Sequence, residues 1–293
     1  MLIVGYGDVG VRVAGLLAPK VRLMALVRGQ GETAAPPPRA AAAGPDEVRR
    51  LRGDLDDAAT LRRLAGVATH VVHLAPPPSQ GTDDRRTAAL LEALARRTPP
   101  QALVYASTSG VYGDCAGATV AETTALRPAT PRAVRRVAAE RRVREFGRRA
   151  GVRASVLRIP GIYAPDRDNG TPRARLLAGT PVLAAEDDVY TNHIHADDLA
   201  RACVLALWRG RPLRTVNTND DSQLKMGDYV DLAADLFGLA RPPRVARAWA
   251  LDHISPTLLS FMSESRRLDN TRLKRELRLR LQYPSPATGL LAK

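Results

Sequence analysis

Apolar runs alternate with segments of helical periodicity through the first half of this chain. Near-continuous apolar runs are typical of parallel strands that are covered on both faces. The predicted strands lie at 2–5, 21–27, 69–75, 101–108 and 153–161, and the predicted helices at 57–66, 83–97 and 132–149. This order predicts an α/β fold, a Rossmann-type doubly wound parallel sheet.

The pattern changes after about residue 160, where Pro and Gly become more frequent and strands become shorter. Helices are predicted near 196–209, 226–238 and 255–263, and charge-rich helical segments near 261–277. We therefore expect an NAD(P)-binding domain at 1–160 and a smaller C-terminal substrate lobe at 161–293, with about 190–218 returning to the first domain. The Pro- and Ala-rich segment 30–47 is predicted to be an irregular surface connection.

Composition narrows the class of partner. The 293 residues carry a formal charge of +14, but 40 of the 44 basic residues are arginine, and these are scattered along the chain with few aromatics between them. Stacking platforms for single-stranded nucleic acid are therefore scarce, and no specific nucleic-acid partner is expected. No leader and no apolar run of about 20 residues is present, so a cytoplasmic protein without a membrane anchor is expected. Cys115 and Cys203 have no metal-binding spacing.

The stretch "GYGDVG" matches the dinucleotide-binding pattern G-x-G-x-x-G directly after an apolar strand and at the start of a helix. Gly5 permits a tight turn, Gly7 lets the backbone approach a pyrophosphate, and Gly10 permits close packing of helix on strand. The helix N-terminus offers free N–H groups to the phosphates. The predicted cofactor contacts here are Gly5, Tyr6, Gly7, Asp8, Val9 and Gly10.

The ends of the next strands predict the adenosine contacts. Arg28 stands where an acidic residue would bind the ribose of NAD, and its guanidinium suits the 2′-phosphate of NADP; we therefore favour NADP over NAD. Asp54 is predicted either to accept from the adenine amino group or to cap the following helix. The residues expected to pack around the adenine are Leu55, Leu74, Ala75 and Pro76.

Several motifs occur in the order seen in one family of enzymes: "GDLDD", "HLAP", "YASTSGVYGD", "LRIPGIYAP" and "NHIHADDLARA". The chain resembles the extended short-chain dehydrogenases/reductases, the NAD-dependent epimerases and dehydratases that act on nucleotide sugars. This resemblance covers nearly the whole chain. It implies a Ser or Thr, a Tyr and a Lys as the catalytic set, and it places Thr108 at the hydroxyl position.

The tyrosine and lysine of that set are absent. No lysine lies between Lys20 and Lys225, and the family pattern aligns Arg132 with the tyrosine and Arg136 with the lysine. The chain is therefore similar to the atypical members of the family. Arg136 is predicted to keep the contact with the nicotinamide ribose, whereas a guanidinium cannot donate the proton.

Other residues are candidates for the remaining roles. Tyr112, four residues after Thr108, is predicted as a substitute acid if a cation lowers the pKa of its phenol. Ser109, Tyr163 and Arg266 are predicted to contact substrate. His193 and His195 share one face of an extended segment, but no metal site is predicted, because the resemblance implies a docking role for this run.

Two functions remain open at this point. The first is an NADP-preferring oxidoreductase or epimerase/dehydratase-like enzyme, with a nucleotide sugar or another small carbonyl or hydroxyl compound as substrate. The second is a catalytically inactive NAD(P)-binding sensor or partner-binding module. Either a monomer or a homodimer is compatible with the sequence.

Overall fold

A seven-stranded parallel sheet forms the centre of the computed structural model, which describes residues 1–18, 20–29 and 48–292. The strand order is β11-β7-β5-β4-β1-β2-β3. The bounds are β1 Leu2–Val4, β2 Leu23–Val27, β3 Val48–Arg52, β4 His70–His73, β5 Ala102–Thr108, β7 Arg153–Ile159 and β11 Arg214–Asn217. The predicted parallel sheet is confirmed, and the connection predicted at 30–47 lies outside the described residues.

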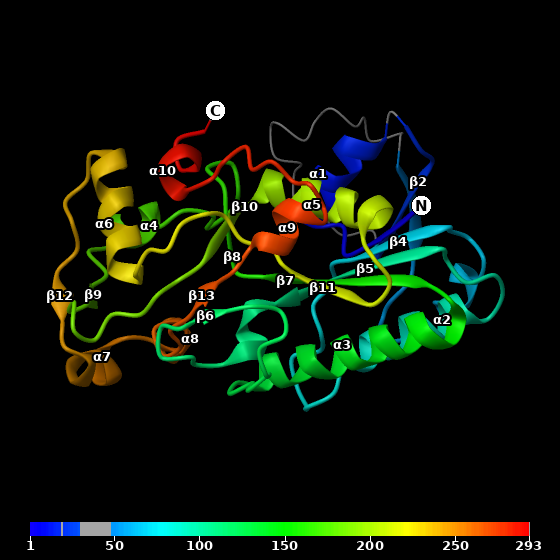
Figure 1. Ribbon diagram of the computed structural model, residues 1–293, viewed down its shortest axis with the longest axis horizontal. Coiled ribbons are helices and arrows are strands. Elements are labelled where there is room, and N and C mark those ends of the chain that lie inside the picture. The colour runs from blue at the N-terminus through cyan, green and yellow to red at the C-terminus, as the bar shows by residue number, and fades with distance from the viewer. Residues whose placement is uncertain (19, 30–47, 293) are drawn as a thin grey trace.

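Helices cover both faces of this sheet (Figure 1). The pair α1 (Asp8–Leu17) and α5 (Ala196–Arg209) packs on one face, and the pair α2 (Arg85–Ala95) and α3 (Pro131–Ala150) on the other. Two buried apolar clusters result, one between the sheet and each helix pair. The doubly wound arrangement is therefore confirmed.

Local chemistry sets the helix boundaries. At the start of α3, Thr130 accepts a hydrogen bond from the N–H of Ala133 and Pro131 occupies the first turn. The helix predicted at 57–66 is wrong, because only the 3₁₀ turn η2 (Arg62–Leu64) forms there. The Asp57 carboxylate and the Thr60 hydroxyl bond nearby backbone groups instead, which competes with helix formation.

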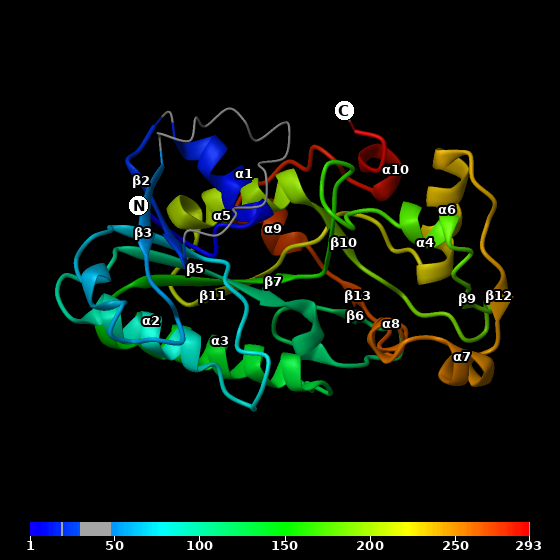
Figure 2. The ribbon, with the colours of Figure 1, turned by 180° about the vertical axis from the view of Figure 1, so that it is seen from behind.

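The second half of the chain builds a smaller lobe at one end of the molecule (Figures 1 and 2). Three two-stranded pairs form it: β6 (Thr119–Val120) with β13 (Arg267–Leu268), β8 (Gly161–Tyr163) with β10 (His193–His195), and β9 (Val182–Leu183) with β12 (Arg244–Val245). Its helices are α4 (Arg173–Leu177), α6 (Met226–Phe237), α7 (Arg247–His253), α8 (Pro256–Phe261) and α10 (Pro286–Gly289), whereas α9 (Thr271–Arg275) packs against β11 of the sheet and η3 (Ser109–Tyr112) follows β5. The division at residue 160 stays a prediction.

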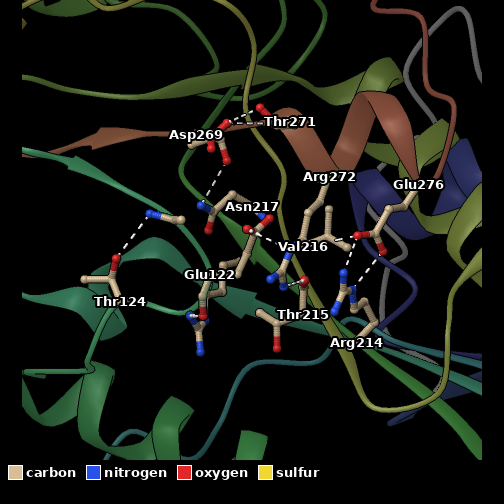
Figure 3. A network of polar contacts seen from close by, with 12 residues as sticks. Glu122, Thr124, Arg214, Thr215, Val216, Asn217, Asp269, Thr271, Arg272 and Glu276 are labelled. Atoms are coloured by element: carbon tan, nitrogen blue, oxygen red, sulfur yellow. Dashed lines mark hydrogen bonds and ion pairs between the residues drawn. The ribbon is translucent and has the colours of Figure 1, made fainter.

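A polar network attaches the lobe to the last strand of the sheet (Figure 3). Asn217 at the end of β11 donates from its side chain to the carbonyls of Val120 and Asp269, and its backbone N–H donates to Glu122. Arg272 of α9 pairs with Glu122 at 3.3 Å and donates to the carbonyl of Thr215. The carboxyl end of β11 is thereby fixed against β6, β13 and α9. No helix among the described residues has the length and apolar character needed to cross a membrane.

Candidate cofactor and substrate site

The glycine loop between β1 and α1 has the geometry that a dinucleotide requires. Gly5 has φ +94°, and a Cβ there would lie 2.5 Å from the N atom of Ala75. A Cβ on Gly10 would lie 2.6 Å from the Gly5 carbonyl oxygen, whereas one on Gly7 would meet nothing within 4 Å. The loop is therefore packed on the protein side and open at Gly7. Because no side chain that the structure describes caps the N-terminus of α1, its N–H groups remain available to a pyrophosphate.

Basic side chains surround the outer end of this loop. Arg28 is exposed just after β2. The pKa of Asp56 is lowered, first by the hydrogen bond from Arg86 and then by nearby positive charges, of which Arg28 is one. On β3, Arg50 is paired in register with Ala25 of the neighbouring strand β2. Burial raises the pKa of Tyr6, and the charge of Arg50 opposes that rise. Arg28 therefore lies close enough to act on Asp56, and Arg50 close enough to act on Tyr6; a contact with a 2′-phosphate stays a prediction.

The other predicted adenine contacts lie around the ends of β3 and β4. The carboxylate of Asp54 accepts from the backbone N–H of Asp56 at 3.0 Å, which is a turn-capping contact. Leu55 and Ala75 are buried, and Pro76 is exposed. Their contact with adenine stays a prediction.

A cavity of about 1170 Å³ lies at the carboxyl ends of β5 and β7 and extends into the smaller lobe. Thr108 at the end of β5 lines it, and its hydroxyl also accepts a weak hydrogen bond from the N–H of Gly110. Val9 of the glycine loop lines the same cavity, so the cofactor loop and the lobe share one space. The cavity also brings together six further residues singled out from the sequence: Leu74, Ser109, Arg132, Arg136, Tyr163 and Arg266.

Tyr112 does not reach this cavity. Its ring is fully buried, and its hydroxyl donates to Asn217 at 2.6 Å and accepts from Arg158 at 2.9 Å. Burial raises the pKa of the phenol, although Arg158 opposes that rise. A phenol whose two partners are both inside the protein has no path to a substrate proton, and we do not retain Tyr112 as the acid.

The two arginines in the tyrosine and lysine positions have different environments. Arg136 donates through Nη1 to the carbonyl of Ala106 at 2.5 Å and to the Tyr105 hydroxyl at 3.1 Å, and it lies over the Tyr105 ring. It is thus anchored to β5 at the cavity wall. Arg132 lies over the ring of Phe261, 5.2 Å from its centroid. A cation therefore occupies the cavity wall at the position that the sequence analysis aligned with the family's tyrosine.

Sequence reasoning missed the far wall of the cavity. Trp249 and His253 of α7 stack with ring centroids 4.1 Å apart, and Phe261 of α8 lines the same wall. His193 stacks on Tyr229 of α6 at 4.0 Å. Apart from His193 of β10, these rings are carried by α6, α7 and α8, which match no motif, so only the folded lobe brings them together.

Charge in the cavity is predominantly positive. Arg132, Arg175 and Arg266 line it, and Glu264 is the one carboxylate among its described lining residues. Arg266 donates to Glu264 Oε2 at 2.7 Å, and Glu264 Oε1 is buried without a partner among the described residues. The cavity is therefore suited to an anionic ligand, and Glu264 is a carboxylate in it that can accept a proton.

The two histidines of β10 pack against other side chains. His193 is buried against Tyr229, and burial lowers its pKa to about 3. His195 accepts from the backbone N–H of Asp197 and stacks with Tyr283. Within the described part of the chain, no group of three or more His, Cys, Asp or Glu side chains is placed to hold a metal ion.

Comparisons with known proteins agree with this architecture. A structure of a functionally unknown conserved protein from Silicibacter pomeroyi DSS is 30% identical, with TM-score 0.79 and coverage of 99% of this chain and 95% of that chain. MoeE5, solved with UDP-glucuronic acid and NAD, is 25% identical, with TM-score 0.74 over 99% and 95% of the two chains.

A curated relative, dTDP-glucose 4,6-dehydratase from Mycobacterium tuberculosis, is 31% identical over 58% of this chain and 56% of its own length. The chain thus matches little more than half the length of the curated relatives. The sequence model of the NAD dependent epimerase/dehydratase family matches residues 2–218, and the chain belongs to that family.

Proposed function

We propose that this protein is an NADP-preferring enzyme that transfers hydride to or from a small anionic carbonyl or hydroxyl compound, such as a nucleotide sugar. The observation that carries the proposal is the shared cavity, where Val9 of the glycine loop, Thr108 of the sheet and the arginines of the lobe line one space. We propose further that the protein is cytoplasmic and that its partner is a small molecule.

Each residue has a defined task in this proposal. A bound nicotinamide supplies the hydride acceptor or donor. The Thr108 hydroxyl orients the substrate oxygen, and Arg132 stabilises negative charge on that oxygen without exchanging a proton. Glu264 is the group proposed to take the proton from a substrate hydroxyl while the carbon that bears this hydroxyl loses hydride. In the reverse direction Glu264 returns the proton to the carbonyl oxygen.

A cofactor titration tests the first part. Fluorescence titrations with NADPH and NADH should show tighter binding of NADPH, and Arg28→Gln should weaken NADPH about 10- to 100-fold while changing NADH little, as expected for charge-assisted hydrogen bonds. Arg22→Gln, an exposed arginine before the same strand, is the matched control. Equal affinities for the two cofactors in the wild type contradict the NADP preference.

A substrate screen tests the second part. With saturating NADP and NAD, the wild type should turn over at least one compound from a set of nucleotide sugars and smaller anionic alcohols. Glu264→Gln should lower kcat about 10²- to 10⁴-fold. An unchanged kcat in the variant removes Glu264 from the proton transfer.

A second function is favoured by one observation, the two arginines that stand in place of the family's tyrosine and lysine. It is a protein that binds NAD(P) without turnover, as a sensor or a partner-binding module. Tight cofactor binding combined with no turnover of any compound in the set is the outcome expected from this alternative.

A further inference from the structure

A cluster of charged side chains links the start of α1 to the lobe. Arg12 is almost fully buried and contacts three carboxylates: Asp8 at 3.0 Å, Asp166 at 2.6 Å, and Asp197. All three of its guanidinium nitrogens are used in these contacts. Each nitrogen is thus engaged with a carboxylate and the side chain is buried, so the role of Arg12 is to hold α1, α5 and the loop after β8 together.

A second arginine of the cluster has donors left. Arg167 contacts the other carboxylate oxygen of Asp8 through Nη1, and its side chain is 28% exposed. Its Nε and Nη2 donate to no residue that the structure describes. Arg167 is therefore an arginine held beside the glycine loop with part of its guanidinium free.

The backbone of the loop after β8 fixes this arginine. Gly170 N–H donates to the Arg167 carbonyl at 2.9 Å, and Ala164 N–H donates to the Gly170 carbonyl at 3.2 Å. A Cβ on Gly170 would lie 2.4 Å from the Ala164 carbonyl oxygen, so the closed loop requires glycine there. Gly170 and its neighbour Asn169 line the same cavity as Val9, so Asp8 and Arg167 are each close in sequence to residues of the cavity wall, although neither is among its described lining residues.

We propose that Arg167 is a ligand of the dinucleotide pyrophosphate, oriented by Asp8, which closes the cofactor site from the lobe. This inference rests on the proposed function, because it requires that a dinucleotide binds at the glycine loop. A Cβ at Gly7 would meet no described atom within 4 Å, so the backbone of the glycine loop is open to a ligand there. Arg167 supplies the side-chain cation, and its free nitrogens match two phosphate oxygens.

Charge balance explains why Asp8 needs this partner. A carboxylate in the first turn of α1 is favourable for the helix dipole but repels a pyrophosphate at the same N-terminus. The cluster contains three carboxylates, Asp8, Asp166 and Asp197, against the two guanidinium groups of Arg12 and Arg167. Without Arg167, the charge of Asp8 would be balanced by Arg12 alone, which also pairs with Asp166 and Asp197, and one Asp8 oxygen would lose its cationic partner.

Direct binding measurements test the proposal. In titrations of the full chain with NADPH and with ADP-ribose, Arg167→Gln should raise the Kd of both ligands about tenfold, because each contains the pyrophosphate. Asp8→Asn removes the orienting contact, which weakens binding, and also the repelling charge, which strengthens it, so it should raise the Kd clearly less than Arg167→Gln does. The unequal responses of the two partners are the signature of a ligand contact.

A purely structural ion pair gives a different result. If the pair only fastens the loop to α1, loss of either partner should weaken binding to the same extent, and that outcome overturns the proposal, as does an unchanged Kd in Arg167→Gln. Arg241→Gln and Asp235→Asn, which break an exposed ion pair of 2.7 Å elsewhere in the lobe, are the matched controls. Failure of the wild type to bind either ligand counts against the proposed function itself, whereas wild-type binding with an unaffected Arg167→Gln variant counts against this inference alone.

Discussion

Glu140→Gln is expected to be strongly destabilising, because Glu140 is the counterion of a fully buried arginine. Its two oxygens accept from Arg158 at 3.1 and 2.8 Å, from Ser107 at 2.7 Å and from Arg144 at 3.0 Å. Glu140 is inaccessible and Arg158 is 2% exposed. A glutamine presents an amide NH₂ to at least one of these donors and leaves the Arg158 charge without compensation. Breaking a buried pair in this way costs about 3–5 kcal/mol of the free energy of unfolding.

The assay is urea unfolding followed by circular dichroism, with the loss read from the midpoint at constant m-value. Glu145→Gln is the control on the same helix, because its pair with Arg149 is exposed and such pairs contribute at most about 1 kcal/mol. The double variant Glu140→Gln/Arg158→Met removes both charges and should be more stable than Glu140→Gln alone. A loss in Glu140→Gln no larger than that in Glu145→Gln would refute the reasoning.

Three further predictions concern the loop and two buried titratable groups. Gly10→Ala should lower the free energy of unfolding by about 1–3 kcal/mol, because the new Cβ would lie 2.6 Å from the Gly5 carbonyl oxygen. Gly7→Ala should leave thermal stability unchanged but weaken NADPH binding in titrations. Equal stability of the two variants would contradict this. Burial lowers the pKa of His193 to about 3, so the unfolded chain takes up a proton near pH 6.5 that the folded chain does not; wild-type stability relative to His193→Phe should fall by about 1.4 kcal/mol per unit as pH drops from 6 to 4. Burial raises the pKa of Asp220 to about 7, so between pH 4 and 7 the folded chain keeps a proton that the unfolded chain releases. The stability of the wild type relative to Asp220→Asn should therefore fall as the pH rises from 4 to 7. For either residue, an equal pH dependence of urea unfolding in variant and wild type would exclude the linkage.

The sequence predicted those features that depend on local pattern. The sheet was predicted from apolar runs, which are buried on both faces. The glycine loop was predicted from three glycines whose spacing fits a single tight turn. The helix predicted at 57–66 failed because Asp and Thr side chains bond the local backbone there.

Contacts between distant segments could not be predicted. Tyr112 faces Asn217, 105 residues later, and no periodicity indicates that its phenol is enclosed. The contact of Asp8 with Arg167 joins residues 159 apart, and the aromatic wall of α7 and α8 exists only after the lobe has folded. The cofactor loop was therefore readable from the sequence, whereas the polar partners that decide its chemistry were not.

The position of β11 has a consequence for synthesis on the ribosome. β11 pairs with β7, but β7 ends at Ile159 and β11 begins only at Arg214, so about 55 residues must be translated between the two strands. At roughly 5–20 residues per second this takes several seconds. Throughout that interval the nascent chain presents the unpaired edge of a buried apolar strand, a surface prone to intermolecular pairing. Slow or interrupted translation between these two strands should therefore favour aggregation and recruit chaperones.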